Sequence, residues 1–292
     1  MKQKKGIRSI SIRQLRILTL TLICIFAVML GISLSIKSSD AKSMKDPVIS
    51  NSRPAPNSFE ELKKPKLAII IDDFGQSRAG VAEMMEINRP LTIAVMPFLS
   101  YSKKDAQEAH KHGYEVIVHL PMQSQNIDIK SWLGPYPVEV SQSDSEIEKV
   151  VIDSLGGIPY AVGVNIHMGA LSSTDERVVE CVMRILKQKK CYFIDSRTTG
   201  KSVCDKVSEE VGVLYGKRNV FLDNGTKDKN YVKKQIRLAA DIADKNGYAI
   251  AIGHVGSMGG AETAEAIKEM IPELEDRGIQ LVFVSQLVKA SK

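Results

Sequence analysis

The chain has 292 residues, enough for one α/β barrel and an extension. Its formal net charge of +6 is unevenly distributed: residues 1–65 contain 12 Lys/Arg and 4 Asp/Glu, and the remaining residues contain 28 and 30. Because the main part of the chain has no cationic surplus to attract phosphates, we expect no nucleic-acid partner.

The N-terminal region predicts a membrane segment. A basic tail at 1–16 precedes residues 17–36, a 20-residue stretch without a charged side chain. This length spans a bilayer core as a helix, and the preceding cations favour a cytoplasmic N-terminus. We predict a single-pass transmembrane signal-anchor; a cleaved signal peptide is the alternative, since Ser38, Ser39 and Ala41 could form a cleavage site. Either interpretation places residues 37–292 outside the cytoplasm. The protein is anchored in the cell membrane if the segment is retained and secreted if it is cleaved.

Residues 37–65 are polar, contain Pro54, Pro56 and Pro65, and lack hydrophobic periodicity, which is typical of a linker. From residue 66 to 292, short apolar runs alternate with helical patterns at Asp144–Leu155, Thr174–Lys189, Lys227–Asn246 and Gly260–Met270. Apolar runs without polar alternation indicate strands that are buried on both faces, hence a parallel sheet covered by helices. We predict an α/β fold, a (β/α) barrel of seven or eight parallel strands, with an open sheet as the alternative. The predicted strands are Leu67–Ile71, Leu91–Met96, Glu115–Val118, Ala161–Ile166, Tyr192–Ile194, Val220–Leu222, Tyr248–Ile252 and Gln280–Val284.

Many of these runs end on a residue that can bind a metal or transfer a proton. In a parallel barrel such residues gather at the C-terminal rim, where barrel enzymes have their active sites. Three of the five histidines occupy these positions. The pattern therefore predicts an active site with a metal, and its residues are Asp72, Asp73, His119, His167, Asp195, Asp223 and His254.

Two histidines and a carboxylate are a common ligand set for a catalytic zinc ion. A second carboxylate can then deprotonate water, and another imidazole can protonate a leaving nitrogen. Structural interpretations stay open: Asp72 and Asp73 could cap a helix, Asp195 could cap another, and a tight turn is the favoured interpretation of Asp223.

The segment 123–143 has no periodicity and follows a rim histidine, as binding loops often do. Trp132 and Tyr136 could stack on a sugar ring, because an aromatic face buries apolar C–H surface. The alternative is that the two side chains fasten the loop to the domain.

Five segments together resemble the divergent polysaccharide deacetylase family, the YibQ-like branch of the NodB-type carbohydrate esterases. They are IIIDDFG, HLPMQ, GVNIHMGA, FIDS and the late GH, and they follow the family's order over residues 66–290. The resemblance implies a distorted (β/α) barrel, a divalent metal, often zinc, and removal of acetyl groups from N-acetylated glycans.

The paired aspartates of the family's first motif match Asp72 and Asp73. The resemblance therefore implies that Asp73 is a metal ligand and that Asp72 is the base. His119 matches the first histidine ligand. Typical members carry the second histidine four residues later, where this chain has Gln123, so the resemblance points to His167 instead.

The family's general acid corresponds to His254, supported by Asp195. Branch members often have asparagine directly before the motif's histidine; here Asn165 stands one residue further back, and we count it with Trp132 and Tyr136 among the substrate contacts.

The predicted function is a membrane-anchored, metal-dependent de-N-acetylase of a cell-envelope polysaccharide. A non-catalytic glycan-binding or envelope-assembly protein that retains the fold is the first alternative, motivated by Gln123. A metal-free glycosidase that uses Asp72 with Asp195 or Asp223 is the second, and it leaves the rim histidines without a role.

Overall fold

A computed structural model describes residues 64–125 and 132–290. The predicted basic tail, the membrane segment 17–36 and nearly all of the linker lie outside these residues. Within the two described ranges, no helix is long and apolar enough to cross a membrane.

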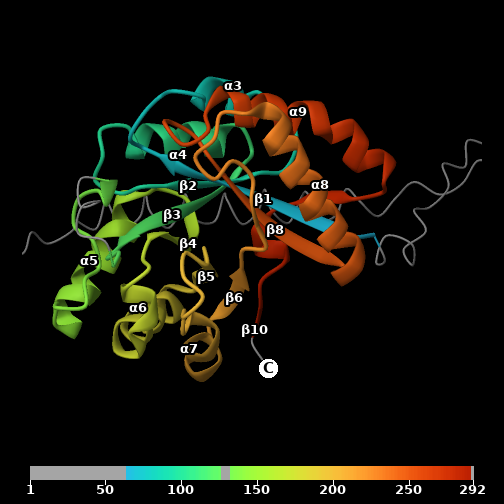
Figure 1. Cartoon of the computed structure of the whole chain (residues 1–292). Coiled ribbons are helices and arrows are strands. Elements are labelled where there is room, and N and C mark those ends of the chain that lie inside the picture. Colours follow the sequence, from blue (N-terminus) through green and yellow to red (C-terminus); the bar gives the residue numbers. More distant parts are fainter. Residues whose placement is uncertain (1–63, 126–131, 291–292) are drawn as a thin grey trace, which may run out of the picture. The chain divides into compact units, whose positions relative to one another are not determined.

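Eight parallel strands form the centre of the domain in the order β6-β5-β4-β3-β2-β1-β8-β7. Figure 1 shows the sheet with helices on either side of it. In the described part of the chain no pairing joins β6 to β7, so the barrel is open between them. This arrangement confirms the predicted α/β fold, a distorted (β/α) barrel. The strands are β1 (Lys66–Phe74), β2 (Thr92–Val95), β3 (Glu115–Met122), β4 (Ala161–Met168), β5 (Tyr192–Asp195), β6 (Leu214–Lys217), β7 (Val220–Phe221) and β8 (Tyr248–His254).

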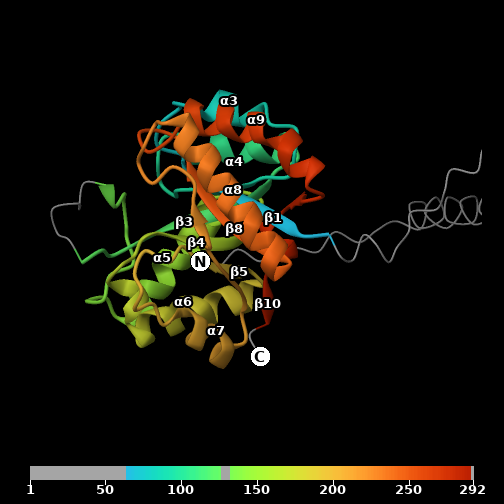
Figure 2. The ribbon, with the colours of Figure 1, turned by 45° about the vertical axis from the view of Figure 1, so that its right-hand side comes forward.

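Helices cover the outer surface of the strands (Figures 1 and 2). Each presents an apolar face to the sheet; in α6, for example, Val178, Val182 and Leu186 repeat every four residues and are buried. The outward side chains of the strands pack against these faces, which explains why the strands are apolar on both sides. The helices are α3 (Val81–Met85), α4 (Ser102–Lys111), α5 (Asp144–Gly157), α6 (Glu176–Lys189), α7 (Cys204–Val211), α8 (Lys229–Asn246) and α9 (Ala261–Asp276), with a 3₁₀ turn, η2, at Ser172–Thr174.

The C-terminal segment fills the N-terminal end of the barrel interior. β9 (Gln280–Val282) pairs with the first residues of β1, the 3₁₀ turn η3 (Val284–Gln286) follows, and β10 (Lys289–Ala290) pairs antiparallel with β6. Val284 and Leu287 belong to the apolar cluster inside the barrel. The interior is therefore apolar at this end, and its polar residues lie at the other.

One strand prediction was wrong, and one barrel strand was not predicted. Gln280–Val284 was predicted as a barrel strand, but only its first three residues are a strand, and they pair outside the barrel order. The missing barrel strand is β6, which the pattern did not predict. Its half-exposed Leu214, its glycine and its lysine do not form an apolar run.

Candidate active site

Because side chains two residues apart in a strand share a face, the inner face of the barrel leads from the apolar interior to the site. Ile70, Ile117 and Ile252 belong to the inner apolar cluster. Two residues further along each strand stand Asp72, His119 and His254, so these polar side chains share the inner face at the C-terminal rim. Asp72 also lies directly opposite His254 in the pairing of β1 with β8.

Asp73 reaches the interior because β1 is irregular at this point. Ile69 and Ile71 pack in the outer core, so a regular strand would also direct residue 73 outward. Instead, the register with β2 shifts between Ile71 and Phe74, and Asp73 adopts a φ of 69°. This left-handed conformation is costly for a residue with a side chain and concentrates at functional sites. Here it brings two consecutive aspartates to one site.

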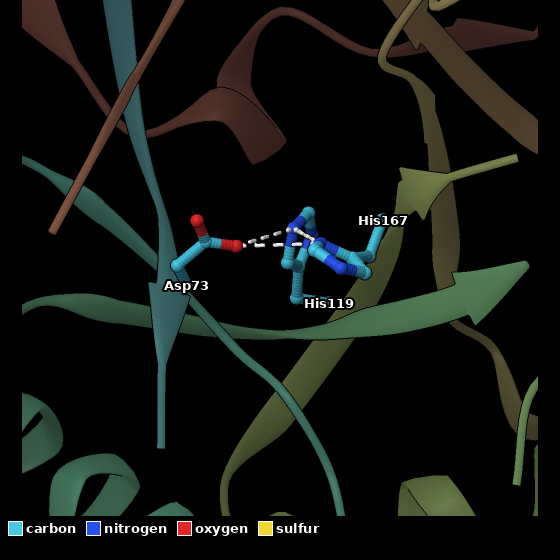
Figure 3. Close-up of side chains that lie close together, drawn as sticks. All are labelled: Asp73, His119 and His167. Atoms are coloured by element: carbon cyan, nitrogen blue, oxygen red, sulfur yellow. Dashed lines mark hydrogen bonds and ion pairs between the residues drawn. The ribbon is translucent and has the colours of Figure 1, made fainter. Parts of the chain in front are cut away.

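Asp73, His119 and His167 converge from β1, β3 and β4 (Figure 3). The Nδ1 atom of His167 is 3.0 Å from Nε2 of His119, and Oδ1 of Asp73 is 3.3 Å from the former and 3.4 Å from the latter. Bonds of about 2 Å to a tetrahedral cation place its ligands roughly 3.3 Å apart. The triangle therefore has the size that a metal site requires.

Hydrogen bonds fix the tautomers of both histidines. Asn165 donates from Nδ2 to Oδ1 of Asp72 at 2.7 Å, so its own Oδ1 faces His119 and accepts from Nδ1 at 2.8 Å. The Nε2 atom of His167 is 2.8 Å from the backbone oxygen of Trp132, which can only accept. In its neutral form, each ring therefore donates outward and presents a lone pair inward, the form in which a histidine binds a metal.

The inward nitrogens and the Asp73 carboxylate form a set of acceptors without donors. Among the described residues, Oδ1 of Asp73 is buried and has no hydrogen-bond partner. Buried acceptors normally have a partner, and converging lone pairs repel each other unless a cation lies between them. These three atoms are therefore suitable ligands for a divalent metal. The structure supports the predicted metal site in its ligands, without identifying the metal.

The two aspartates differ in their electrostatic environment. Burial raises the pKa of Asp72, and the neighbouring charge of Asp73 acts in the same direction. For Asp73, burial also acts to raise the pKa, but protons carried by His119 and His167 in the absence of a cation outweigh it and hold the pKa well below its usual range; a cation between the three residues would act in the same direction. Asp73 is therefore the anionic ligand, and Asp72 is the carboxylate with the greater affinity for a proton.

His254 is paired with Asp223. The Nδ1 atom of His254 is 2.7 Å from Oδ1 of Asp223, while Oδ2 accepts from the backbone N–H of His254 at 2.7 Å and from the Thr263 hydroxyl at 3.0 Å. Burial lowers the pKa of His254, but the hydrogen bond and the charge of Asp223 overcome this and raise it to about 9. The pair with Asp223 thus favours the imidazolium form of His254.

The prediction that Asp195 supports His254 was wrong. Phe193, two residues earlier in β5, packs in the outer core, so the strand period directs Asp195 to the outer side of the barrel. There its carboxylate accepts from the backbone N–H of Arg197 and from the hydroxyls of Ser202 and Tyr215. Asp195 organises the loop after β5. Asp72 lines the cavity over the site, but neither Asp195 nor Asp223 is among its described lining residues, which leaves the glycosidase alternative without its second carboxylate.

The Asn165 and Gln123 side chains both hold neighbouring groups in place. Asn165 was predicted as a substrate contact, but it is fully buried and both ends of its amide are occupied by Asp72 and His119. The Gln123 side chain accepts from the backbone N–H of Val140, and its backbone pairs with Val138. Gln123 fastens the loop after β3, and His167 stands in the site in its place.

A cavity of about 190 Å³ opens over the three converging residues. Trp132, a residue that is 54% exposed, lines it, whereas Tyr136 is not among the described lining residues. The buried Leu133 and the pairing of Val138 with Pro121 hold the loop, and the contact of the Tyr136 ring with Phe98 adds to this. The other lining residues are Asp72, Asp73, His119, Ile166, His167, Met168, Ser196, Thr198, Phe221, Asn224, His254 and Met258.

Comparison with known proteins agrees with these features. The model of the family described as divergent polysaccharide deacetylase matches residues 69–288. The uncharacterized protein YibQ of Escherichia coli strain K12 is 34% identical over 223 residues, 76% of this chain and 67% of that protein. An uncharacterized protein of Haemophilus influenzae strain Rd is 34% identical over 193 residues, 65% of this chain and 66% of that protein. The chain thus spans about two-thirds of the length of both relatives.

A solved structure shows the same fold. The uncharacterized protein ATU2773 from Agrobacterium tumefaciens C58 has a TM-score of 0.71 and 21% identity to this chain, and the match covers 77% of this chain and 90% of that one.

Proposed function

Because the chain belongs to the divergent polysaccharide deacetylase family, we propose that it is a metal-dependent hydrolase that removes N-acetyl groups from a cell-envelope polysaccharide. One observation carries the proposal: two histidines with fixed tautomers direct their lone pairs at a buried carboxylate oxygen. A structural role for these residues would not require three acceptors to converge.

Asp73, His119 and His167 would hold the metal, for which zinc is the first choice, since a ligand set of two imidazoles and one carboxylate is typical of catalytic zinc. When bound, such an ion supplies a Lewis acid for the amide carbonyl and lowers the pKa of water. The cavity above the three ligands gives the acetyl group access to them.

Asp72 is proposed as the general base. It lines the cavity next to the metal ligands, and burial raises the pKa of its carboxyl group, which makes it a stronger base than an exposed aspartate. Asn165 holds Oδ1 of Asp72, so Oδ2 is the atom that would take a proton from the attacking water.

His254 is proposed as the general acid. Its pKa of about 9 keeps it protonated at neutral pH, and Asp223 occupies Nδ1. The proton on Nε2 would pass to the amide nitrogen as the bond to the acetyl carbon breaks, and the sugar amine would leave as a neutral group. Asp223 replaces Asp195 as the residue that orients this acid.

The location and the substrate complete the proposal. An uncharged segment at 17–36 after a basic tail supports a membrane-anchored protein with its domain outside the cytoplasm, or a secreted one if the segment is cleaved. An extracytoplasmic deacetylase would meet the N-acetylated glycans of the envelope. Tagging the N-terminus and the C-terminus and testing each tag for protease digestion in intact cells would check this orientation.

The test of the activity is acetate release. The full chain, loaded with zinc, is incubated with N-acetylglucosamine oligomers and peptidoglycan fragments, beside an Asp72→Asn variant. We expect acetate from the wild-type chain and a rate reduced by about 10²–10⁴ in the variant. Sugar binding without acetate release, unaffected by a chelator, would favour the non-catalytic glycan-binding alternative, and full activity of Asp72→Asn would contradict the assigned base.

A further inference from the structure

A second cavity, of about 520 Å³, lies beside an exposed pair of aromatic side chains. Phe98 follows β2 and Tyr136 follows β3, so both come from the C-terminal side of the barrel strands. Their ring centroids are 5.2 Å apart, with the planes at 80°. Phe98 and Tyr136 are 39% and 65% exposed, so the pair presents apolar surface beside the cavity, as binding sites do.

The backbone of both residues is in the left-handed region, with φ of 62° at Phe98 and 49° at Tyr136. Bulky residues rarely adopt this conformation, and such strain clusters at functional sites. Neither residue is buried, so burial in the core does not hold either of them in this conformation.

The remaining lining of the cavity is polar and comes from the loop before α5 and from one face of that helix. An amide, two carboxylates and an ammonium group surround the aromatic pair, and Val150 is the only other apolar contributor among the described residues. Aromatic faces that pack on C–H groups, with hydrogen-bonding groups at their edges, are suited to a sugar ring. The polar side chains are Gln142, Glu146, Lys149 and Asp153.

A short, fixed segment connects this cavity to the metal cavity. Trp132 lines the metal cavity, and Tyr136 follows four residues later, a distance of at most about 14 Å along an extended chain. Leu133 is buried, and Gly134 packs so closely that a Cβ there would stand 2.7 Å from Met96. The two cavities are therefore held at a distance that one short oligosaccharide can span.

We propose that the cavity beside Phe98 and Tyr136 is a distal subsite that binds a sugar residue of the glycan whose acetyl group occupies the metal cavity. This inference rests on the proposed function, because the metal cavity defines the reacting end. It adds a place where a sugar beyond the reacting one is bound, and that Tyr136 contributes to the selection of chain length.

The experiment measures binding to oligomers of different length. Because the full chain with Asp72→Asn is expected to bind without turnover, the dimer and the hexamer of N-acetylglucosamine are titrated into it by calorimetry. The titrations are repeated after Tyr136→Ala is introduced into the same chain. Tyr136→Phe, which retains the aromatic face, is the matched control. We expect the hexamer to bind about tenfold more weakly after Tyr136→Ala, with little change for the dimer and little effect of Tyr136→Phe.

The outcomes separate this inference from the proposed function. Equal losses for dimer and hexamer, or no loss for either, would overturn the subsite while acetate release by the wild-type chain would keep the proposed function. A loss confined to the hexamer, in a protein that releases no acetate, would support the subsite and overturn the hydrolase. Because Tyr136 is exposed, unchanged melting and metal content of the variants would show that the fold is retained.

Discussion

Asn165 connects the proposed base to a metal ligand through a single buried amide. Its Nδ2 atom holds Asp72 and its Oδ1 atom fixes the proton of His119 on Nδ1. The orientation of the amide therefore sets the tautomer that leaves Nε2 free for a metal. Asn165 stands two residues before His167 in β4, on the same face of the strand.

Asn165→Leu is expected to weaken zinc binding by about 10–100-fold, because the variant keeps the size of the side chain but leaves His119 without its acceptor. The measurement is competition with a chelator of known affinity. Asn246→Leu, at an exposed position at the end of α8, is the control and should bind zinc as the wild-type chain does. Wild-type affinity in Asn165→Leu would show that the amide does not position the ligand.

Asp223 and His254 predict the alkaline side of the pH profile. A general acid must be protonated, so the rate should decline as the pH rises through about 9, the pKa of His254. In Asp223→Asn the carboxylate that stabilises the imidazolium is lost, so the decline should move to lower pH and the rate at neutral pH should fall by about 10²–10⁴.

Asp195→Asn is the matched control for this prediction, because Asp195 is also a buried aspartate after a strand but contacts the loop after β5 instead. The pH at which the rate declines should be the same as in the wild-type chain. The assignment of Asp223 would be refuted if Asp195→Asn moved the decline and Asp223→Asn did not.

At the scale of elements, the loop between β8 and α9 leaves space for the Asp223 carboxylate. A Cβ at Gly259 would collide with Oδ2 of Asp223 and stand 2.7 Å from the backbone oxygen of His254. Gly259→Ala should therefore displace Asp223 without replacing either member of the pair, lowering the rate and destabilising the fold by roughly 1–3 kcal/mol.

Thermal melting and acetate release check the Gly259→Ala prediction. Gly156→Ala in α5 is the comparison: a Cβ there meets nothing within 4 Å, and alanine in a helix should stabilise by about 0.5–1 kcal/mol. If Gly259→Ala behaved like Gly156→Ala, the carboxylate would not be as tightly confined as the structure indicates.

The apolar runs of the sequence predicted seven of the eight barrel strands and the rim at which they end, because buried strands of a parallel barrel have no polar face. They could not predict β6, whose exposed Leu214 and Lys217 resemble a loop. The two-residue period of the strands would have distinguished the inward Asp223 from the outward Asp195. Asp223 stands two residues after the inward Phe221, whereas Asp195 stands two residues after the outward Phe193. It would have misplaced Asp73, whose inward direction depends on an irregularity of the backbone.

At the scale of the whole domain, the barrel has chemically distinct ends. The C-terminal segment closes one end with apolar side chains such as Val284 and Leu287. The other end carries the buried carboxylates and imidazoles and opens into the cavity beside Trp132. Because one end is closed by apolar side chains, the chemistry is restricted to the C-terminal rim. The site residues come from strands on both sides of β1.

The most direct test of this account is the metal content of the purified full chain, combined with anomalous X-ray scattering at the zinc edge. We predict one divalent ion per chain, located between Asp73, His119 and His167. His119→Ala and His167→Ala should each lose it, whereas replacing the exposed His110 and His112 together should leave it in place. Unchanged metal content in both ligand variants, or an anomalous peak elsewhere in the chain, would contradict the account.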